Sequence, residues 1–377
     1  MRLLALALLT VTALAQEKPR ARELGVPFTG QPGRWNAITD VSGVEVGHAT
    51  VISGEGEQAV RDGVTIVWPR GHKSDDPAFG AWYAQNGNGE MTGTAWLEES
   101  GFLDSPVMIT NTQSVGTIRD AFIKWQLDNK RPSQTDSFSP FSLPIVAETL
   151  DDYLTNVKLG RVSGEQLVHA IDTAASGPVA EGNVGGGTGM ICYGFKGGIG
   201  TSSRKVGDYT IGVLVQCNCG RRNQLMIGGV PVGREIPGPE LSRNQPGMTE
   251  DIGSIIIVVA TDAPLIPTQL KRLTHRATMG LARTGSSSGN GSGDLFIAFS
   301  TANAHAGGTP AVQHISMLPN DQMNPLFEAT VNATEEAIVN ALVGAETMTG
   351  YQGRSVPALP HDRLRQILSK YNRLENR

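Results

Sequence analysis

The sequence contains no block of like charge and no apolar run long enough to cross a lipid bilayer. Its 31 Lys and Arg residues face 36 Asp and Glu residues, which gives a formal charge of −5 and a pI of about 5.8. A basic patch that would attract a phosphate backbone is therefore missing. We expect neither a nucleic-acid partner nor a membrane partner.

Cysteine is scarce, with only Cys192, Cys217 and Cys219 in the chain. Three cysteines are too few for a disulfide framework, and Cys217 and Cys219 stand two apart in a strand-like stretch, where neighbours on one face rarely bridge. We expect three buried free thiols. A cysteine nucleophile is the alternative, but no histidine that would act as its base lies nearby in the sequence.

Metal-binding and phosphate-binding motifs are also missing. The seven histidines are scattered without an H-E-x-x-H or similar ligand spacing. The glycine-rich segment 182–189 lacks a Gly-Lys-Ser/Thr sequence and a following helix, so it favours backbone packing or a substrate-facing turn over nucleotide binding. We expect no metal ion and no cofactor.

The first residues have the shape of a secretory signal. Arg2 precedes a short apolar run that ends in Ala13-Leu14-Ala15, a small-residue cleavage motif. We expect residues 1–15 to be removed and the protein to be exported, either secreted or periplasmic. A buried N-terminal helix is the alternative interpretation.

Strand-like and helix-like stretches alternate along the rest of the 377-residue chain. The apolar runs 209–216 and 254–261 indicate central strands that helices cover on both faces, which is typical of a layered α/β sandwich. The Gly/Ser-rich residues 196–204 are predicted to form a hairpin turn. Further predicted strands are 36–46, 63–68, 106–110, 190–194 and 295–300, and predicted helices are 115–125, 163–175, 267–283, 324–346 and 361–371.

Ser254 stands at the junction between a long polar loop and the buried strand 254–261. The loop, residues 228–253, has too much Pro and Gly for a helix or a central strand, so we expect it to be functional or cut. Cleavage of the Gly253–Ser254 bond would give Ser254 a hydroxyl nucleophile and an α-amine, whose ordinary pKa of about 7.7–8.0 suits a general base. The alternative is a plain strand boundary.

Five stretches point to one family: Gly-Ser followed by IIIVVATDAPLIPTQLKRL, and GNVGGGTGMICYGFKGGIGTSSR, SGSGDLFIAFST, NAITDVSGVEVGHAT and NGNGEMTG. The sequence resembles the L-aminopeptidase D-esterase/β-aminopeptidyl hydrolase family, the self-processing N-terminal serine hydrolases of peptidase family S58. The resemblance implies a four-layer αββα sandwich like that of N-terminal nucleophile hydrolases and ornithine acetyltransferases. It also implies one domain built from an α chain (16–253) and a β chain (254–377), and a homo-oligomer of such units.

The resemblance assigns catalytic roles around Ser254. Asn218 would donate its side-chain amide to the oxyanion. Ser292 would relay a proton to or from the new α-amine, and Asp294 would orient Ser292 and stabilise the ammonium. Without the resemblance, Asn218 is a turn cap, and Ser292 and Asp294 belong to an ordinary Gly/Ser loop.

Four residues are candidates for substrate binding. Asn88 and Glu90 belong to a segment, 85–93, that forms either tight turns or part of the active-site wall. Glu148 offers a carboxylate for the N-terminal amine of a substrate. Leu150 stands where the family implies an aromatic residue at the oxyanion or substrate end, so the substrate range and part of the stabilisation stay open at this position.

These observations predict an exported serine aminopeptidase that cleaves itself before Ser254. It would hydrolyse the N-terminal residue from peptides, amino-acid amides or esters through an acyl-enzyme. Two alternatives stay open. One is an acyltransferase resembling ornithine acetyltransferase, although those proteins use threonine where this chain has serine. The other is a non-catalytic relative that binds peptides in the same cleft.

Overall fold

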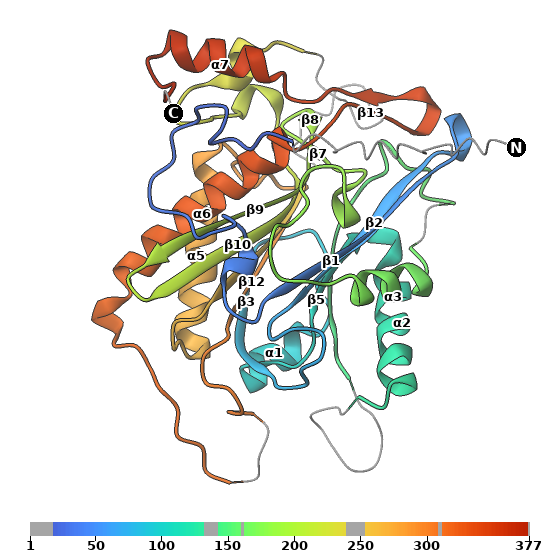
Figure 1. Ribbon diagram of the computed structural model, residues 1–377. Helices are drawn as coiled ribbons and strands as arrows, with labels where there is room; N and C mark the ends of the chain where they lie inside the picture. The colour runs from blue at the N-terminus through green and yellow to red at the C-terminus, as the bar shows by residue number, and fades with distance from the viewer. Residues whose placement is uncertain (1–17, 132–141, 160–161, 239–252, 308–310, 376–377) are drawn as a thin grey trace, which may run out of the picture.

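Two larger sheets lie face to face in the computed structural model, which describes residues 18–131, 142–159, 162–238, 253–307 and 311–375 (Figure 1). The six-stranded sheet has the order β4-β3-β12-β11-β10-β9, and the four-stranded sheet has the order β1-β2-β5-β6. Strand β11 pairs with β12 in parallel and with β10 antiparallel, so β11 lies inside its sheet. No helix within the described ranges is long and apolar enough to cross a membrane.

The bounds of the elements are as follows. The six-stranded sheet contains β3 (Ala78–Gly87), β4 (Phe102–Leu103), β9 (Gly198–Val206), β10 (Tyr209–Asn218), β11 (Ser254–Thr261) and β12 (Gly293–Ser300). The four-stranded sheet contains β1 (Glu45–Ser53), β2 (Val60–Trp68), β5 (Val107–Asn111) and β6 (Ile145–Thr149). The helices are α1 (Thr94–Ser100), α2 (Val115–Asp128), α3 (Gly164–Asp172), α4 (Val232–Glu235), α5 (Pro267–Arg283), α6 (Asn324–Val343) and α7 (His361–Lys370).

Separate apolar cores hold the layers together. Ile255 and Ile257 of β11 point into the core under α5 and α6, whereas Ile256 and Val258 point into the core between the two sheets. A further core packs α2 and α3 against the outer face of the four-stranded sheet and includes Ile66. The layers therefore follow the order helices, sheet, sheet, helices, which confirms the four-layer αββα sandwich predicted from the sequence. A strand buried on both faces, such as β11, requires cover on both sides.

The strongest local patterns are confirmed closely. Strand β11 and helix α5 have the predicted bounds, and the predicted helices at 115–125, 324–346 and 361–371 correspond to α2, α6 and α7. Helix α3 begins with a capping box, in which Ser163 Oγ accepts the Gln166 N–H and Gln166 Oε1 accepts the Ser163 N–H. These elements form where local sequence and packing agree.

The predicted strand at 36–46 is wrong. Residues Ile38–Asp40 form a 3-10 helix, and β1 begins only at Glu45. The Asp40 carboxylate accepts the backbone N–H of Trp35 at 2.9 Å and the hydroxyl of Ser203 at 2.6 Å. These bonds fold the segment into a turn that alternating apolar residues alone do not reveal.

The predicted hairpin turn at 196–204 is also wrong, because Gly198–Val206 is strand β9. Its small residues let α6 approach the sheet closely. A Cβ on Gly200 would lie 2.0 Å from the Ala337 carbonyl oxygen, and Ser202 Oγ donates to the Ala333 carbonyl at 2.6 Å. The Gly/Ser composition therefore serves helix-sheet packing rather than a turn.

The predicted strand at 190–194 is reduced to β7 (Ile191–Cys192), because Tyr193 and Gly194 adopt positive φ angles of 51° and 67° and turn the chain back into β8 (Phe195–Lys196). This turn lies beside the end of β10, where the Tyr193 N–H donates to the Cys219 carbonyl at 2.7 Å.

The prediction of three free thiols is wrong for Cys192 and Cys217, which form a disulfide. Cys219 is buried and takes no part in this disulfide. The β7–β8 turn brings Cys192 against the end of β10, across a sequence separation of 25 residues. Spacing between the cysteines carries no information on this approach, so the sequence favoured the wrong state.

Gly200→Ala should lower the thermal unfolding midpoint, because the added methyl group meets the backbone of α6. Overpacking of this kind costs about 1–3 kcal/mol. Gly116→Ala in α2 is the matched control, since nothing lies within 4 Å of its added Cβ. Thermal unfolding of both variants checks the prediction, and equal midpoints would contradict it.

Candidate active site

Ser254 lies at one end of the six-stranded sheet, where β11 and β12 begin and β10 and β3 end. The pairing register sets Ser254 opposite Asn218 on β10 and beside Gly293 on β12. Ser254 is buried, with 6% of its surface exposed. The sheet therefore joins three sequence segments around this serine.

The backbone N–H of Gly293 faces the Gly253–Ser254 bond. It donates to the Gly253 carbonyl oxygen at 3.3 Å and to Ser254 Oγ at 3.2 Å. A donor in this place polarises the carbonyl and holds the hydroxyl close to it. Gly293 was not a candidate site residue in the sequence, although it stands between two candidates, Ser292 and Asp294.

Only glycine fits at position 293. A Cβ there would lie 2.4 Å from the Asn88 carbonyl oxygen, so the segment after β3 packs directly on the start of β12. Asn88 Nδ2 also donates to the Gly291 carbonyl at 2.9 Å. The predicted substrate-binding residue Asn88 thus lies next to Ser254 in space, and its amide holds the loop before β12.

Ser292 and Asp294 point the same way, as their spacing predicts. Ser292 Oγ donates to Asp294 Oδ1 at 2.7 Å, and both side chains are buried. Gly293 between them pairs with Ser254. The hydroxyl–carboxylate pair therefore flanks the start of β11, where a chain terminus would carry its amine.

The side-chain amide of Asn218 has a fixed orientation. Its Oδ1 accepts the Ile191 N–H at 2.8 Å, and its Nδ2 donates to the Leu150 carbonyl at 2.9 Å. An amide held in this way beside Ser254 can stabilise negative charge that develops on a carbonyl oxygen. Leu150 enters the site through its backbone carbonyl, whereas the sequence directed attention to its side chain.

Glu148 is, after Asp294, a second buried carboxylate of the site, with 4% of its surface exposed. Its Oε1 accepts the Glu90 N–H at 2.9 Å, and the Thr112 hydroxyl donates to its other oxygen. Burial raises the pKa of Glu148 above its ordinary value, and these two hydrogen bonds oppose the rise. No sequence pattern singled out Thr112, which follows β5.

Glu148 lies close to Gly293, on the other side of Gly89. A Cβ on Gly89 would lie 3.2 Å from the Gly293 Cα and 3.3 Å from Glu148 Oε1, so this glycine separates them by little more than its own width. The Glu90 side chain is exposed. The structure thus brings together every site residue that the sequence suggested, while their chemical roles stay predictions.

A second buried polar group lies behind Leu150. Asn111 Nδ2 donates to Asp62 Oδ2 at 2.7 Å and lies 3.2 Å from Asp151 Oδ2. Burial raises the pKa of Asp151 to about 7, and burial together with the charge of Asp151 raises the pKa of Asp62 well above its ordinary value. Neither aspartate was a candidate in the sequence.

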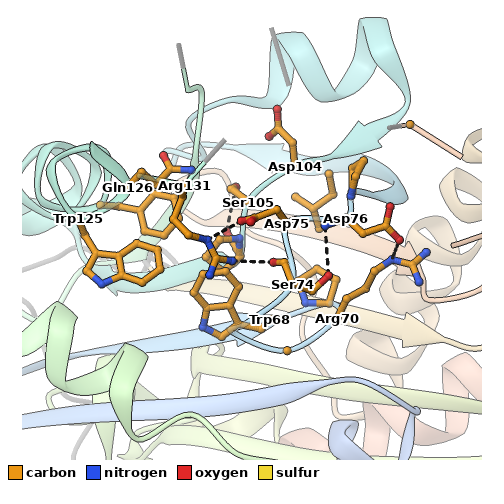
Figure 2. A pocket seen from close by; sticks show the side chains of 17 residues that line it. Trp68, Arg70, Ser74, Asp75, Asp76, Asp104, Ser105, Trp125, Gln126 and Arg131 are labelled. Atoms are coloured by element: carbon orange, nitrogen blue, oxygen red, sulfur yellow. Dashed lines mark hydrogen bonds and ion pairs between the residues drawn. The ribbon is translucent and has the colours of Figure 1, made fainter. Parts of the chain in front are cut away.

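A cavity of about 430 Å³ contains none of the site residues described above (Figure 2). It lies at the other end of β2, around Trp68. Its arginines are engaged within the wall: Arg70 binds Asp76 at 3.3 Å, and Arg131 binds Asp75 at 2.5 Å (Figure 2). The cavity and the cluster at Ser254 are separate features of the fold.

A comparison with known protein families identifies the family of this chain. The family model of peptidase family S58 matches residues 36–356. The chain belongs to this family. It is a hydrolase of the N-terminal nucleophile aminopeptidase type, which confirms the enzyme class expected from the sequence.

Two curated relatives carry the name β-peptidyl aminopeptidase BapA. The protein from Sphingosinicella microcystinivorans is 52% identical, and the match covers 97% of this chain and 96% of the relative. The protein from Sphingosinicella xenopeptidilytica is 48% identical over 93% of this chain and 91% of the relative. The S58 chain is thus similar to these peptidases over nearly its whole length.

Solved structures show the same fold. The L-aminopeptidase D-Ala-esterase/amidase from Ochrobactrum anthropi, described as a variant of the Ntn hydrolase fold, superposes with a TM-score of 0.86 at 45% identity and covers 95% of this chain and 100% of its own. A β-aminopeptidase from Burkholderia sp. superposes with a TM-score of 0.84 at 41% identity, with coverage of 95% and 100%. The predicted N-terminal nucleophile hydrolase fold is confirmed.

Asp151→Asn should flatten the pH dependence of stability. In the native state Asp151 keeps its proton up to about pH 7, whereas the unfolded chain releases it near the ordinary value of 3.8. The contribution of Asp151 to the free energy of unfolding should therefore be fully present below this lower value and be lost as the pH rises to about 7, by up to about 1.4 kcal/mol per pH unit.

Urea unfolding of wild type, Asp151→Asn and the exposed control Asp172→Asn between these pH values checks the prediction. The dependence of the free energy of unfolding on pH should be weaker in Asp151→Asn than in the wild type and unchanged in Asp172→Asn. Equal slopes in all three proteins would contradict the assignment.

Proposed function

We propose that this S58 enzyme is an exported aminopeptidase that cleaves its own Gly253–Ser254 bond and then uses Ser254 as its nucleophile. It removes the N-terminal residue from peptides, including peptides that begin with a β-amino acid, and from amino-acid amides and esters. The single observation that supports this most is the Gly293 N–H, which reaches both the Gly253 carbonyl oxygen and Ser254 Oγ.

In the self-cleavage step, Ser254 Oγ attacks the carbonyl carbon of Gly253. The Gly293 N–H supports the charge that forms on the carbonyl oxygen. The C–N bond breaks, the hydroxyl proton passes to the departing nitrogen, and Gly253 is held as an ester on Ser254. Water hydrolyses this ester, which leaves Gly253 as one chain end and Ser254 with a free α-amine.

In turnover, the α-amine of Ser254 accepts the hydroxyl proton as Oγ attacks the substrate carbonyl. The Asn218 amide stabilises the oxyanion, and removal of one such donor typically costs about 3–4 kcal/mol in barrier height. The Ser292–Asp294 pair relays the proton and balances the ammonium. The leaving amine takes the proton, and water then releases the acyl group from Ser254.

Glu148 binds the N-terminal ammonium group of the substrate. Its buried carboxylate lies beside Gly89 and Gly293, next to the nucleophile. The names of the Sphingosinicella and Burkholderia relatives support β-aminoacyl substrates, and the Ochrobactrum structure supports amides and esters. Leu150 offers an apolar wall, and Asn88 and Glu90 border the substrate cleft.

Export and assembly belong to the same proposal. The signal-like residues 1–15 lie outside the described residues, so secretion to the periplasm or the medium rests on their sequence alone. The chains 16–253 and 254–377 would form one domain, and several such units would form a homo-oligomer. These statements rest on the resemblance of the sequence to its family.

Ser254→Ala should stop both self-cleavage and peptidase activity, since the variant lacks the attacking oxygen. Intact mass and N-terminal sequencing should show two fragments in the wild type, the smaller beginning Ser-Ile-Ile-Ile, and one uncut chain in Ser254→Ala. The exposed Ser287→Ala variant should process normally. An uncut wild-type chain, or a processed Ser254→Ala chain, would refute the nucleophile assignment.

Glu148→Gln should raise KM about 10–100-fold with a smaller change in kcat, because a charge-assisted hydrogen bond to the ammonium is worth about 1.5–3 kcal/mol. Hydrolysis of a β-homoalanyl p-nitroanilide provides the measurement. Glu99→Gln, an exposed change on α1, should leave KM unchanged. Rapid wild-type cleavage of the N-acetylated substrate, or an unchanged KM in Glu148→Gln, would contradict recognition of the amine by Glu148.

A further inference from the structure

Asp62, Asn111 and Asp151 form a buried cluster that the reaction steps above do not use. Asp62 lies on β2, Asn111 ends β5, and Asp151 lies two residues beyond the end of β6. One amide faces both carboxyl groups, with Asn111 Nδ2 at 2.7 Å from Asp62 Oδ2 and at 3.2 Å from Asp151 Oδ2. All three side chains are almost completely buried.

Within the described part of the chain, no cationic side chain balances the charge of this cluster. Among the described residues, no ion pair joins Asp62 or Asp151 to a Lys, Arg or His, and the neighbouring Asp152 adds negative charge near Asp151. The Gly63 N–H donates to Asp62 Oδ1 at 2.6 Å and supports one charge. Two ionised carboxylates in so dry a place repel strongly, so the pair holds at least one proton.

The cluster connects directly to the oxyanion amide. Leu150, whose carbonyl accepts Asn218 Nδ2 at 2.9 Å, is the residue before Asp151. The Asp151 carbonyl accepts the N–H groups of Leu154 at 3.1 Å and Thr155 at 3.0 Å, which fixes the turn after β6. The position of Asp151 therefore sets the position of the Leu150 carbonyl.

Close packing leaves Asp151 little room to move. A Cβ on Gly189 would lie 2.8 Å from the Asp151 Cβ, so the glycine-rich segment 182–189 forms the wall behind it. This segment drew attention in the sequence as a possible phosphate loop. Its glycine at position 189 instead gives the buried aspartate its space.

We propose that Asp62, Asn111 and Asp151 are positioning residues of the peptidase: the two carboxyl groups keep at least one proton and, through the Leu150 carbonyl, the cluster orients the Asn218 amide toward the oxyanion. This inference rests on the proposed function of Asn218. Loss of the last of these protons leaves two repelling charges, displaces Asp151 and the Leu150 carbonyl, and lowers kcat with little effect on KM.

A double-mutant cycle between Asn111→Ala and Asn218→Ala tests the connection. Processed enzyme and the p-nitroanilide substrate are used throughout. Each single variant should lower kcat at least tenfold, and Asn111→Ala should have no further effect when Asn218 is already alanine. If the two losses multiply, the cluster does not act through Asn218, and the inference is wrong while the proposed oxyanion role stands.

Failure of the proposed function has a different signature. If Asn218→Ala alone leaves kcat unchanged, Asn218 does not support the oxyanion, and both this role and the inference built on it are overturned.

The pH profile of kcat tests the inference independently. This test remains usable if the Asn218→Ala variant does not cleave itself. Asp62→Asn resembles the protonated state of one member of the pair, so the alkaline fall of kcat should move upward by at least one pH unit, with KM unchanged. Asp151→Asn should do the same, and the exposed Asp172→Asn control should follow the wild type. An alkaline limb at the same pH in all four proteins would overturn the inference.

Discussion

The register of β11 between β10 and β12 is the constraint on which the site depends. It sets Ser254 opposite Asn218 and beside Gly293, three residues that lie far apart in the sequence. A slip of one residue would turn Ser254 to the opposite face of the sheet and would exchange the two apolar sets of β11 between their cores. Burial of β11 on both faces excludes such a slip, so the same packing that stabilises the fold also specifies the chemistry.

The layers of helices and sheets must approach each other closely to fix the positions of these residues. The small residues of the chain allow that approach. Gly200 admits the backbone of α6, Gly293 admits the backbone of Asn88, and Gly189 admits Asp151. Each contact joins segments that are distant in the sequence. Glycine in this chain thus serves close packing between distant segments as well as turns.

The sequence predicted those parts of the structure that local pattern determines. The β-branched run after Ser254, the amphipathic helix α5 and the spacing of Ser292 and Asp294 each contain their own signal, and the structure agrees with all three. Close approach between distant segments has no such signal, which is why β9 was taken for a turn and Cys192 for a free thiol. Asp62, Asn111 and Asp151 were missed for the same reason, since they become a group only when β2, β5 and β6 come together.

The order of strands in the six-stranded sheet would have a consequence for a protein cut between Gly253 and Ser254. Strands β12 and β11 belong to the segment after Gly253, and they lie between β3 and β10, which belong to the segment before it. Two polypeptides produced by a cut at this point would be interleaved within one sheet, so neither could leave without breaking the hydrogen bonds of a neighbour on each side. Unfolding would then release two separate chains, and refolding of the sheet would depend on their concentration. The stability of such a protein would be kinetic, set by the rate at which it unfolds.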